Sequence, residues 1–208
     1  MFFNFLVSPK KITPSPSYVA QGGFGLIELM VSVTIMVIVA GIVITNQGSF
    51  NNTVLLHGQA YEIALQIRDV QQSAVSANFD GGEYRSIMGV HFNLSNKQSY
   101  TVFRDLATGG VGHNIFYDVG EEFGVQGFID PRFEIKKITY TDTGVVHELN
   151  EISIVFIRPN FDPYFVKEEG GLSNIVETNS VFIDIGLVGE AGVFKTIEVT
   201  ATGQIAVQ

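Results

Sequence analysis

The sequence predicts an α+β protein, with a long N-terminal helix followed by an all-β head that is most simply a β-sandwich. Residues 24–44 carry a single charge, Glu28, in an otherwise uncharged and mostly apolar run. Residues 53–78 place apolar side chains at alternating spacings of three and four, the period of one helix face. Residues 80–208 then change to short β-branched and aromatic segments separated by glycine turns.

Composition excludes several classes of function. The 208 residues contain no cysteine, which removes disulfides, thiolate metal sites and thiol nucleophiles. The formal net charge is −9, and the first 23 residues hold Lys10 and Lys11 but no acid. The remainder therefore has 10 basic and 21 acidic side chains, a net charge of −11. Such a surface repels nucleic acid, so we expect no nucleic-acid partner.

The apolar run over 24–44 has the length of a membrane helix, since about 20 residues cross the hydrocarbon core of a bilayer. Two small residues, Gly22 and Gly23, stand before this run. A secretory signal has its small-residue cleavage site after the apolar core, so the order here is reversed. A protease acting at these glycines would remove only a polar leader and leave the apolar helix on the mature protein.

The segment GFGLIE at residues 23–28, with the apolar run behind it, resembles the processing and methylation motif of type IV pilins and of the pseudopilins of type II secretion systems. The resemblance implies that a prepilin peptidase cuts between Gly23 and Phe24, that Phe24 becomes the N-methylated terminus, and that Glu28 acts in subunit assembly. Gly25 departs from the family, which commonly has Ser or Thr there.

The resemblance also implies a domain plan and a location. It implies a leader over 1–23, a transmembrane and assembly helix over 24–45, an amphipathic continuation over 46–79 and a β-rich head over 80–208. The expected location is the inner membrane, crossed once with the head on the extracytoplasmic side, and then a pilus or pseudopilus filament. The expected partners are other pilin or pseudopilin subunits and the prepilin peptidase and methyltransferase.

Glu28 has two interpretations. A carboxylate near the bilayer centre costs about 2.5–3.5 kcal/mol on insertion scales, so it needs a partner or a shallow position. Glu28 could neutralise the new ammonium of its own Phe24, one helical turn away, where the helix dipole also favours an anion. Alternatively it meets the Phe24 ammonium of a neighbouring subunit and fixes the register of packing, which is what the resemblance favours.

The amphipathic half of the helix should lie against the head. Its apolar stripe contains Ala60, Ile63, Ile67, Val70, Ala74 and Ala77, and its polar side contains Glu62, Gln66, Asp69 and Gln72. Three glycines weaken this helix by roughly 1 kcal/mol each relative to alanine, so we expect a bend or local melting between Gly41 and Asn52. The tripeptide at 80–82, Asp-Gly-Gly, should close the helix.

The head should contain a series of short strands. The strand segments are expected at 86–92, 100–105, 133–140, 152–158, 181–187, 196–201 and 204–207. The last two should form a hairpin around Thr202 and Gly203. Residues 120–127 and 160–171 are expected to be exposed loops. Their aromatic residues should cover the open edge of the sandwich rather than form a contact patch; these are Phe123, Phe161, Tyr164 and Phe165.

No catalytic, cofactor or metal site is expected from the sequence. The four histidines lack metal-ligand spacing, which indicates ordinary surface or strand residues; they are His57, His91, His113 and His147. The acids of the loops lack the ordered spacing of a calcium site, so we expect a solvated acidic face; they are Glu121, Glu122, Asp130 and Asp142.

Three functions remain open. The first is a minor pilin or pseudopilin, most like the H-type minor pseudopilins, that starts or caps a filament. The second is a major pilin that builds the shaft. The third is a singly anchored extracytoplasmic binding protein or enzyme in which the glycine-phenylalanine motif is accidental, and no sequence feature favours it.

Overall fold

The computed structural model describes residue 23 and residues 25–76, 87–106, 114–169 and 172–208. The chain divides into two compact units, Met1–Asn46 and Gln47–Gln208. One helix, α1 (Leu26–Val75), belongs to both units and is unbroken between Gly41 and Asn52. The local melting that we expected there is therefore not observed. Asp80 and its two glycines lie outside the described residues, as does Ala77.

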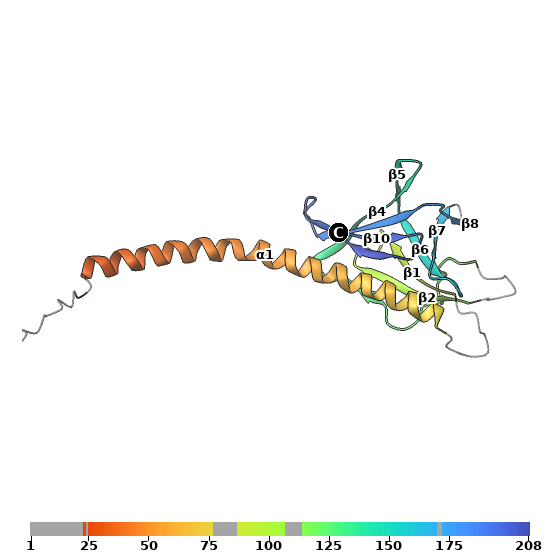
Figure 1. Ribbon diagram of the computed structural model, residues 1–208, viewed down its shortest axis with the longest axis horizontal. Coiled ribbons are helices and arrows are strands. Elements are labelled where there is room, and N and C mark those ends of the chain that lie inside the picture. Colours follow the sequence, from red (N-terminus) through yellow and green to blue (C-terminus); the bar gives the residue numbers. More distant parts are fainter. Residues whose placement is uncertain (1–22, 24, 77–86, 107–113, 170–171) are drawn as a thin grey trace, which may run out of the picture. The chain divides into compact units, whose positions relative to one another are not determined.

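The head contains two antiparallel sheets, which confirms the predicted fold class (Figure 1). The six-stranded sheet has the order β3-β2-β1-β6-β7-β8, with β1 (Ile87–Asn93), β2 (Ser99–Asp105), β3 (Gly127–Phe128), β6 (Glu151–Phe156), β7 (Pro163–Glu169) and β8 (Leu172–Ile175). The five-stranded sheet has the order β11-β10-β9-β4-β5, with β4 (Phe133–Asp142), β5 (Val145–Leu149), β9 (Ser180–Leu187), β10 (Phe194–Thr200) and β11 (Ile205–Val207).

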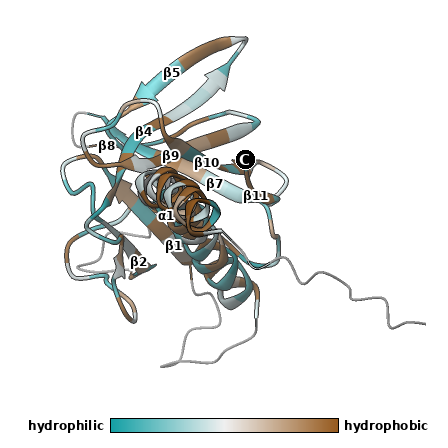
Figure 2. Cartoon of the chain, turned by 90° about the vertical axis from the view of Figure 1, so that its left-hand side faces the viewer, coloured by the Kyte–Doolittle hydropathy of each residue, from teal (hydrophilic) through white to brown (hydrophobic). Residues whose placement is uncertain are grey.

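The core of the head is shared by the outer half of α1 and by both sheets. Figure 2 looks along the helix and shows β4, β9 and β10 on one side of it and β1 and β2 on the other. The helix contributes the predicted stripe, and each sheet contributes alternate residues of its strands, because successive side chains of a strand point to opposite faces. The buried helix residues are Leu56, Ala60, Ile63, Ala64, Ile67, Val70 and Ala74.

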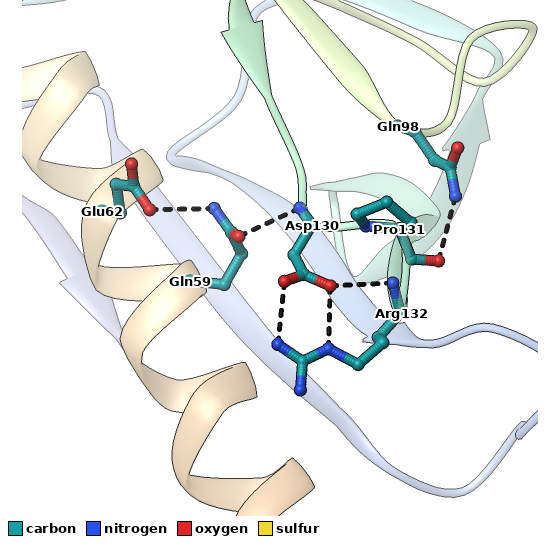
Figure 3. Close-up of polar contacts among 6 residues, drawn as sticks. All are labelled: Gln59, Glu62, Gln98, Asp130, Pro131 and Arg132. Carbon is teal, nitrogen blue, oxygen red and sulfur yellow. Dashed lines mark hydrogen bonds and ion pairs between the residues drawn. The ribbon is translucent and has the colours of Figure 1, made fainter.

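Glutamine side chains tie α1 to loops of the head on two sides. Gln59 accepts a hydrogen bond from the backbone N–H of Asp130 at 3.1 Å and donates to Glu62 at 3.2 Å (Figure 3). Gln71 donates to the carbonyl oxygens of Phe161 and Gly203, both at 2.9 Å. Both glutamine side chains are largely buried, so their partly buried bonds to Asp130, Phe161 and Gly203 help to fix α1 against the head.

The six-stranded sheet has a second, smaller core on the face that points away from α1. It contains Ile87, Phe103, Val155 and Val166 from four neighbouring strands. The segment around Phe116 packs over these side chains. This sheet is therefore buried on both faces at its centre, which explains why all of β1 up to Phe92 is buried.

The predicted strands are confirmed to within two residues at the ends that the structure describes. Seven observed strands correspond to them, and β10 and β11 pair as the expected terminal hairpin around Gly203. The expectation that 160–171 is a loop was wrong, because β7 and its edge neighbour β8 occupy part of this region and the residues beyond it. Phe165 is a core residue, 2% exposed, and covers no edge.

Candidate functional site

The residues for which cleavage and assembly roles are expected precede α1 or occupy its first turn, where the structure describes them. Gly23 is exposed, and a Cβ added to it would meet no atom within 4 Å. Phe24 lies outside the described residues. The carbonyl oxygen of Gly25 accepts hydrogen bonds from the backbone N–H groups of Glu28 at 3.0 Å and Leu29 at 3.2 Å. Gly23, which is exposed, thus precedes the first helical turn.

Glu28 occupies the first turn of α1 and is exposed. The first turn carries the positive end of the helix dipole, which stabilises a carboxylate there. No hydrogen bond or ion pair of the Glu28 side chain occurs among the described residues. Its charge is therefore available to a group outside the described part of the chain, which is what either interpretation of Glu28 requires.

The apolar half of α1 is a candidate membrane span. Leu26–Thr45 contains 20 residues with a mean hydropathy of 2.6, and none of this window is buried in the chain. Its hydroxyl groups bond to the helix backbone: Ser32 donates to the Glu28 carbonyl at 2.7 Å, and Thr34 to the Met30 carbonyl at 2.8 Å. These bonds satisfy polar groups that would otherwise be costly in a hydrocarbon environment.

The family model described as the prokaryotic N-terminal methylation motif matches residues 19–44. The chain carries this methylation motif. Neither the curated proteins nor the solved structures contain a match to the chain. The matched region therefore covers the apolar half of α1 up to residue 44 and does not extend into the head.

Within the residues that the structure describes, no group of three or more histidine or acidic side chains could hold a metal ion. The loop acids that we considered are used by the head itself. The Glu121 carboxylate accepts hydrogen bonds from the backbone N–H groups of Leu106 at 2.9 Å and Asp118 at 3.0 Å. Glu121 is only 6% exposed, so the expectation of a solvated acid was wrong for this residue.

The other loop acids also have local roles. Glu122 accepts a hydrogen bond from the Tyr117 hydroxyl at 2.5 Å. Asp130 pairs with the Arg132 guanidinium at 2.8 Å, and this bond lowers the pKa of Asp130 to about 2 (Figure 3). Asp142 is exposed on the β4–β5 hairpin. These carboxylates lie in separate turns and do not converge on one position.

His91 is a buried titratable residue whose environment the sequence did not reveal. Its Nδ1 lies 3.0 Å from the Ser153 hydroxyl and its Nε2 lies 3.8 Å from the Glu151 carboxylate. Phe116 and Tyr117 pack against its ring. Burial lowers the pKa of His91 to about 4. Ser153 is fully buried and His91 is 6% exposed, so this pair acts as a satisfied polar group beside the smaller core, and the partly exposed Glu151 lies at its edge.

The remaining histidines are ordinary, as expected, where the structure describes them. His57 lies on the exposed side of α1 against Tyr61, and His147 stacks on Tyr140 at the exposed strand β5. His113 lies outside the described residues.

Proposed function

We propose that this protein is a structural subunit, a minor pilin or pseudopilin of a type IV pilus or a type II secretion-like filament. The observation that carries the proposal is the methylation motif at 19–44 placed directly on an exposed apolar helix of membrane length. The β-rich head behind that helix agrees with such a subunit. The H-type minor pseudopilins and related minor pilins remain the subtype that the overall plan resembles.

In this proposal each motif residue has a separate role. Prepilin peptidase cuts between Gly23 and Phe24, and Phe24 becomes the methylated terminus. The helix over 24–45 holds the subunit in the inner membrane, with the head outside the cytoplasm, until the subunit enters the filament. Glu28 then pairs with the terminal ammonium of a neighbouring subunit, because both charges are poorly solvated among apolar helices. The chain itself catalyses nothing.

Intact-mass and N-terminal analysis of the membrane-extracted protein tests this proposal. In a host with an active prepilin peptidase, the mature chain should begin at methylated Phe24. A chain that keeps Met1 in that host would contradict the proposal and favour a singly anchored binding protein. A matched host without the peptidase provides the control, since it should yield only the uncut chain.

A second candidate is a major pilin that forms the shaft of the filament. It shares the motif and the apolar helix, and differs in copy number. Quantitative mass spectrometry of sheared filaments distinguishes the two. A minor subunit should be present at a small fraction of the main filament protein, whereas a major pilin should itself be the main protein.

A further inference from the structure

A groove of about 580 Å³ runs along one flank of the outer half of α1, within the head unit. Its helix wall includes Val70 and four polar residues at the spacing of a single helix stripe, which are Glu62, Gln66, Asp69 and Ser73. Glu62 and Asp69 are exposed, and the described residues provide no ion-pair partner for either carboxylate. This wall therefore presents negative charge to an incoming ligand.

The other wall and the floor of the groove are apolar. The floor includes Tyr100 and Val102 of β2, and the facing wall is the segment with Phe123, Val125 and Phe128. Val125 is 84% and Phe128 72% exposed, so this wall leaves a large apolar surface in water. The Arg104 guanidinium stacks over the Phe123 ring at 4.2 Å and holds that ring in place. The groove thus has an acidic side and an apolar side.

Tyr100 supplies a polar group on the floor of the groove. Its side chain is 5% exposed, and no residue described in the structure forms a hydrogen bond with its hydroxyl. This hydroxyl is not one of the fully buried unpaired atoms, so it is open to the groove. Burial and the nearby Glu62 carboxylate raise the pKa of Tyr100 to about 12, so the group remains a protonated donor. Gly127 lies against the Tyr100 ring, where a Cβ would collide with it, so the loop closes tightly over the floor.

Net charge decides between a basic partner and a second copy of this chain. The head from Gln47 onward has 20 acidic side chains, the chain total of 21 less Glu28, and 10 basic side chains, the total of 12 less Lys10 and Lys11. A second head with the same net charge of −10 is repelled, whereas a basic segment is attracted and steered to the acidic wall.

We propose that this groove binds an extended segment of another protein in which basic and apolar side chains alternate. Successive side chains of an extended strand point to opposite sides. Basic side chains therefore reach Glu62 and Asp69 while the apolar ones between them pack on Phe123, Val125 and Phe128. The Tyr100 hydroxyl donates to a backbone carbonyl of the bound segment. This partner is additional to the filament contacts of the proposed function.

The test uses the full chain in nanodiscs of zwitterionic lipid and a fluorescein-labelled peptide of alternating lysine and valine, about six residues long. Fluorescence polarisation should report saturable binding that weakens as salt is raised, because exposed charge pairs are screened. The double variant Glu62→Gln/Asp69→Asn should bind about fivefold more weakly. The matched control Asp162→Asn/Glu190→Gln removes two exposed carboxylates outside the groove and should bind like the parent.

Three results would overturn the proposal. The first is equal binding of a glutamate and valine peptide, and the second is an equal loss of binding in the control variant. The third is self-association of the parent that Glu62→Gln/Asp69→Asn abolishes, which would assign the groove to a second copy. Unchanged thermal unfolding of both double variants shows that the head remains folded. Processing at Phe24 is read separately by mass, so failure of the groove proposal does not affect the filament proposal.

Discussion

Lowering the pH from 7.5 to 4.5 should weaken the head through one side chain, His91. In the folded protein, burial lowers the pKa of His91 to about 4, whereas an unfolded histidine titrates near 6.5. Between these two pKa values the unfolded chain therefore binds a proton at His91 that the folded chain does not bind. The stability that neutral His91 provides is complete above pH 6.5 and is lost progressively as the pH falls towards 4.

The size of this loss follows from the two pKa values. At pH 4.5 the difference between about 4 and 6.5 corresponds to about 2.5 kcal/mol. This is an upper bound, because the Glu151 carboxylate lies 3.8 Å from Nε2 and supports the imidazolium when the ring does take a proton. Burial and the charge of Glu168 raise the pKa of Glu151, which weakens that support once Glu151 is itself protonated.

The assay is urea unfolding of the full chain in nonionic micelles at pH 7.5 and 4.5, followed by the circular dichroism of the β head. The parent is compared with His91→Gln, which cannot titrate. Relative to His91→Gln, the free energy of unfolding of the parent should fall by up to about 2.5 kcal/mol between pH 7.5 and 4.5. Contributions from other titrating groups are common to both proteins and cancel. His147→Gln is the matched control, because His147 is exposed on β5.

Two outcomes would refute this reasoning. The first is a difference between parent and His91→Gln that stays constant between the two pH values. The second is a pH response of His147→Gln that matches that of His91→Gln, because His147 is exposed on β5 and lies outside the smaller core.

Other predictions concern the motif and the helix contacts. Glu28→Ala should leave insertion and cleavage intact but prevent crosslinking to neighbouring subunits; normal crosslinking would reject the assembly role. Replacing Gly23 with a bulkier residue should block the cut, as seen by intact mass. Gly203→Ala should destabilise the head by about 2–4 kcal/mol, because φ is 79° and a Cβ would collide with the Phe161 carbonyl, whereas Gly192→Ala, in open space, should be neutral in thermal unfolding. Gln71→Ala should cost about 1–3 kcal/mol in the same assay, since two carbonyl oxygens lose their donor.

The central strands of the five-stranded sheet were predictable because burial on one face leaves a visible alternation. Val181, Ile183 and Ile185 of β9 are fully buried and alternate with partly exposed residues. The apolar stripe of α1 was also predictable, because one side of the helix is buried and its apolar residues recur with the helical period. In both cases the apolar residues occupy the positions that face the main core.

The missed strands lack that signal for physical reasons. In β5, Val145 through Glu148 are exposed, so their side chains need not alternate, and this strand projects at the edge of its sheet (Figure 1). β8 is likewise exposed throughout. β7 begins at Pro163, which suggested a loop, and it is buried on both faces, with Phe165 in the main core and Val166 in the smaller one. Whether such segments form strands depends on their pairing with strands that are distant in the sequence.

The candidate site was predictable in part. Glycine, phenylalanine and glutamate at fixed spacing before an apolar run are local features, and the methylation motif is accordingly found at 19–44. The groove was not predictable, because Glu62, Tyr100 and Val125 are brought together by tertiary packing alone. The burial of His91 likewise depends on the segment around Phe116, which carries no periodic pattern.

The contact between Arg68 on α1 and the carbonyl oxygen of Ile205 on β11, at 3.0 Å, joins residues 137 positions apart. The helix is the first element of the head to be synthesised, and the strand that covers its flank is the final one. Contacts between such distant segments form slowly, because a long loop must close before they can contribute. The apolar stripe of α1 is therefore covered completely only after the last of these strands has been synthesised. A chain interrupted during synthesis would leave that stripe available to chaperones or to aggregation.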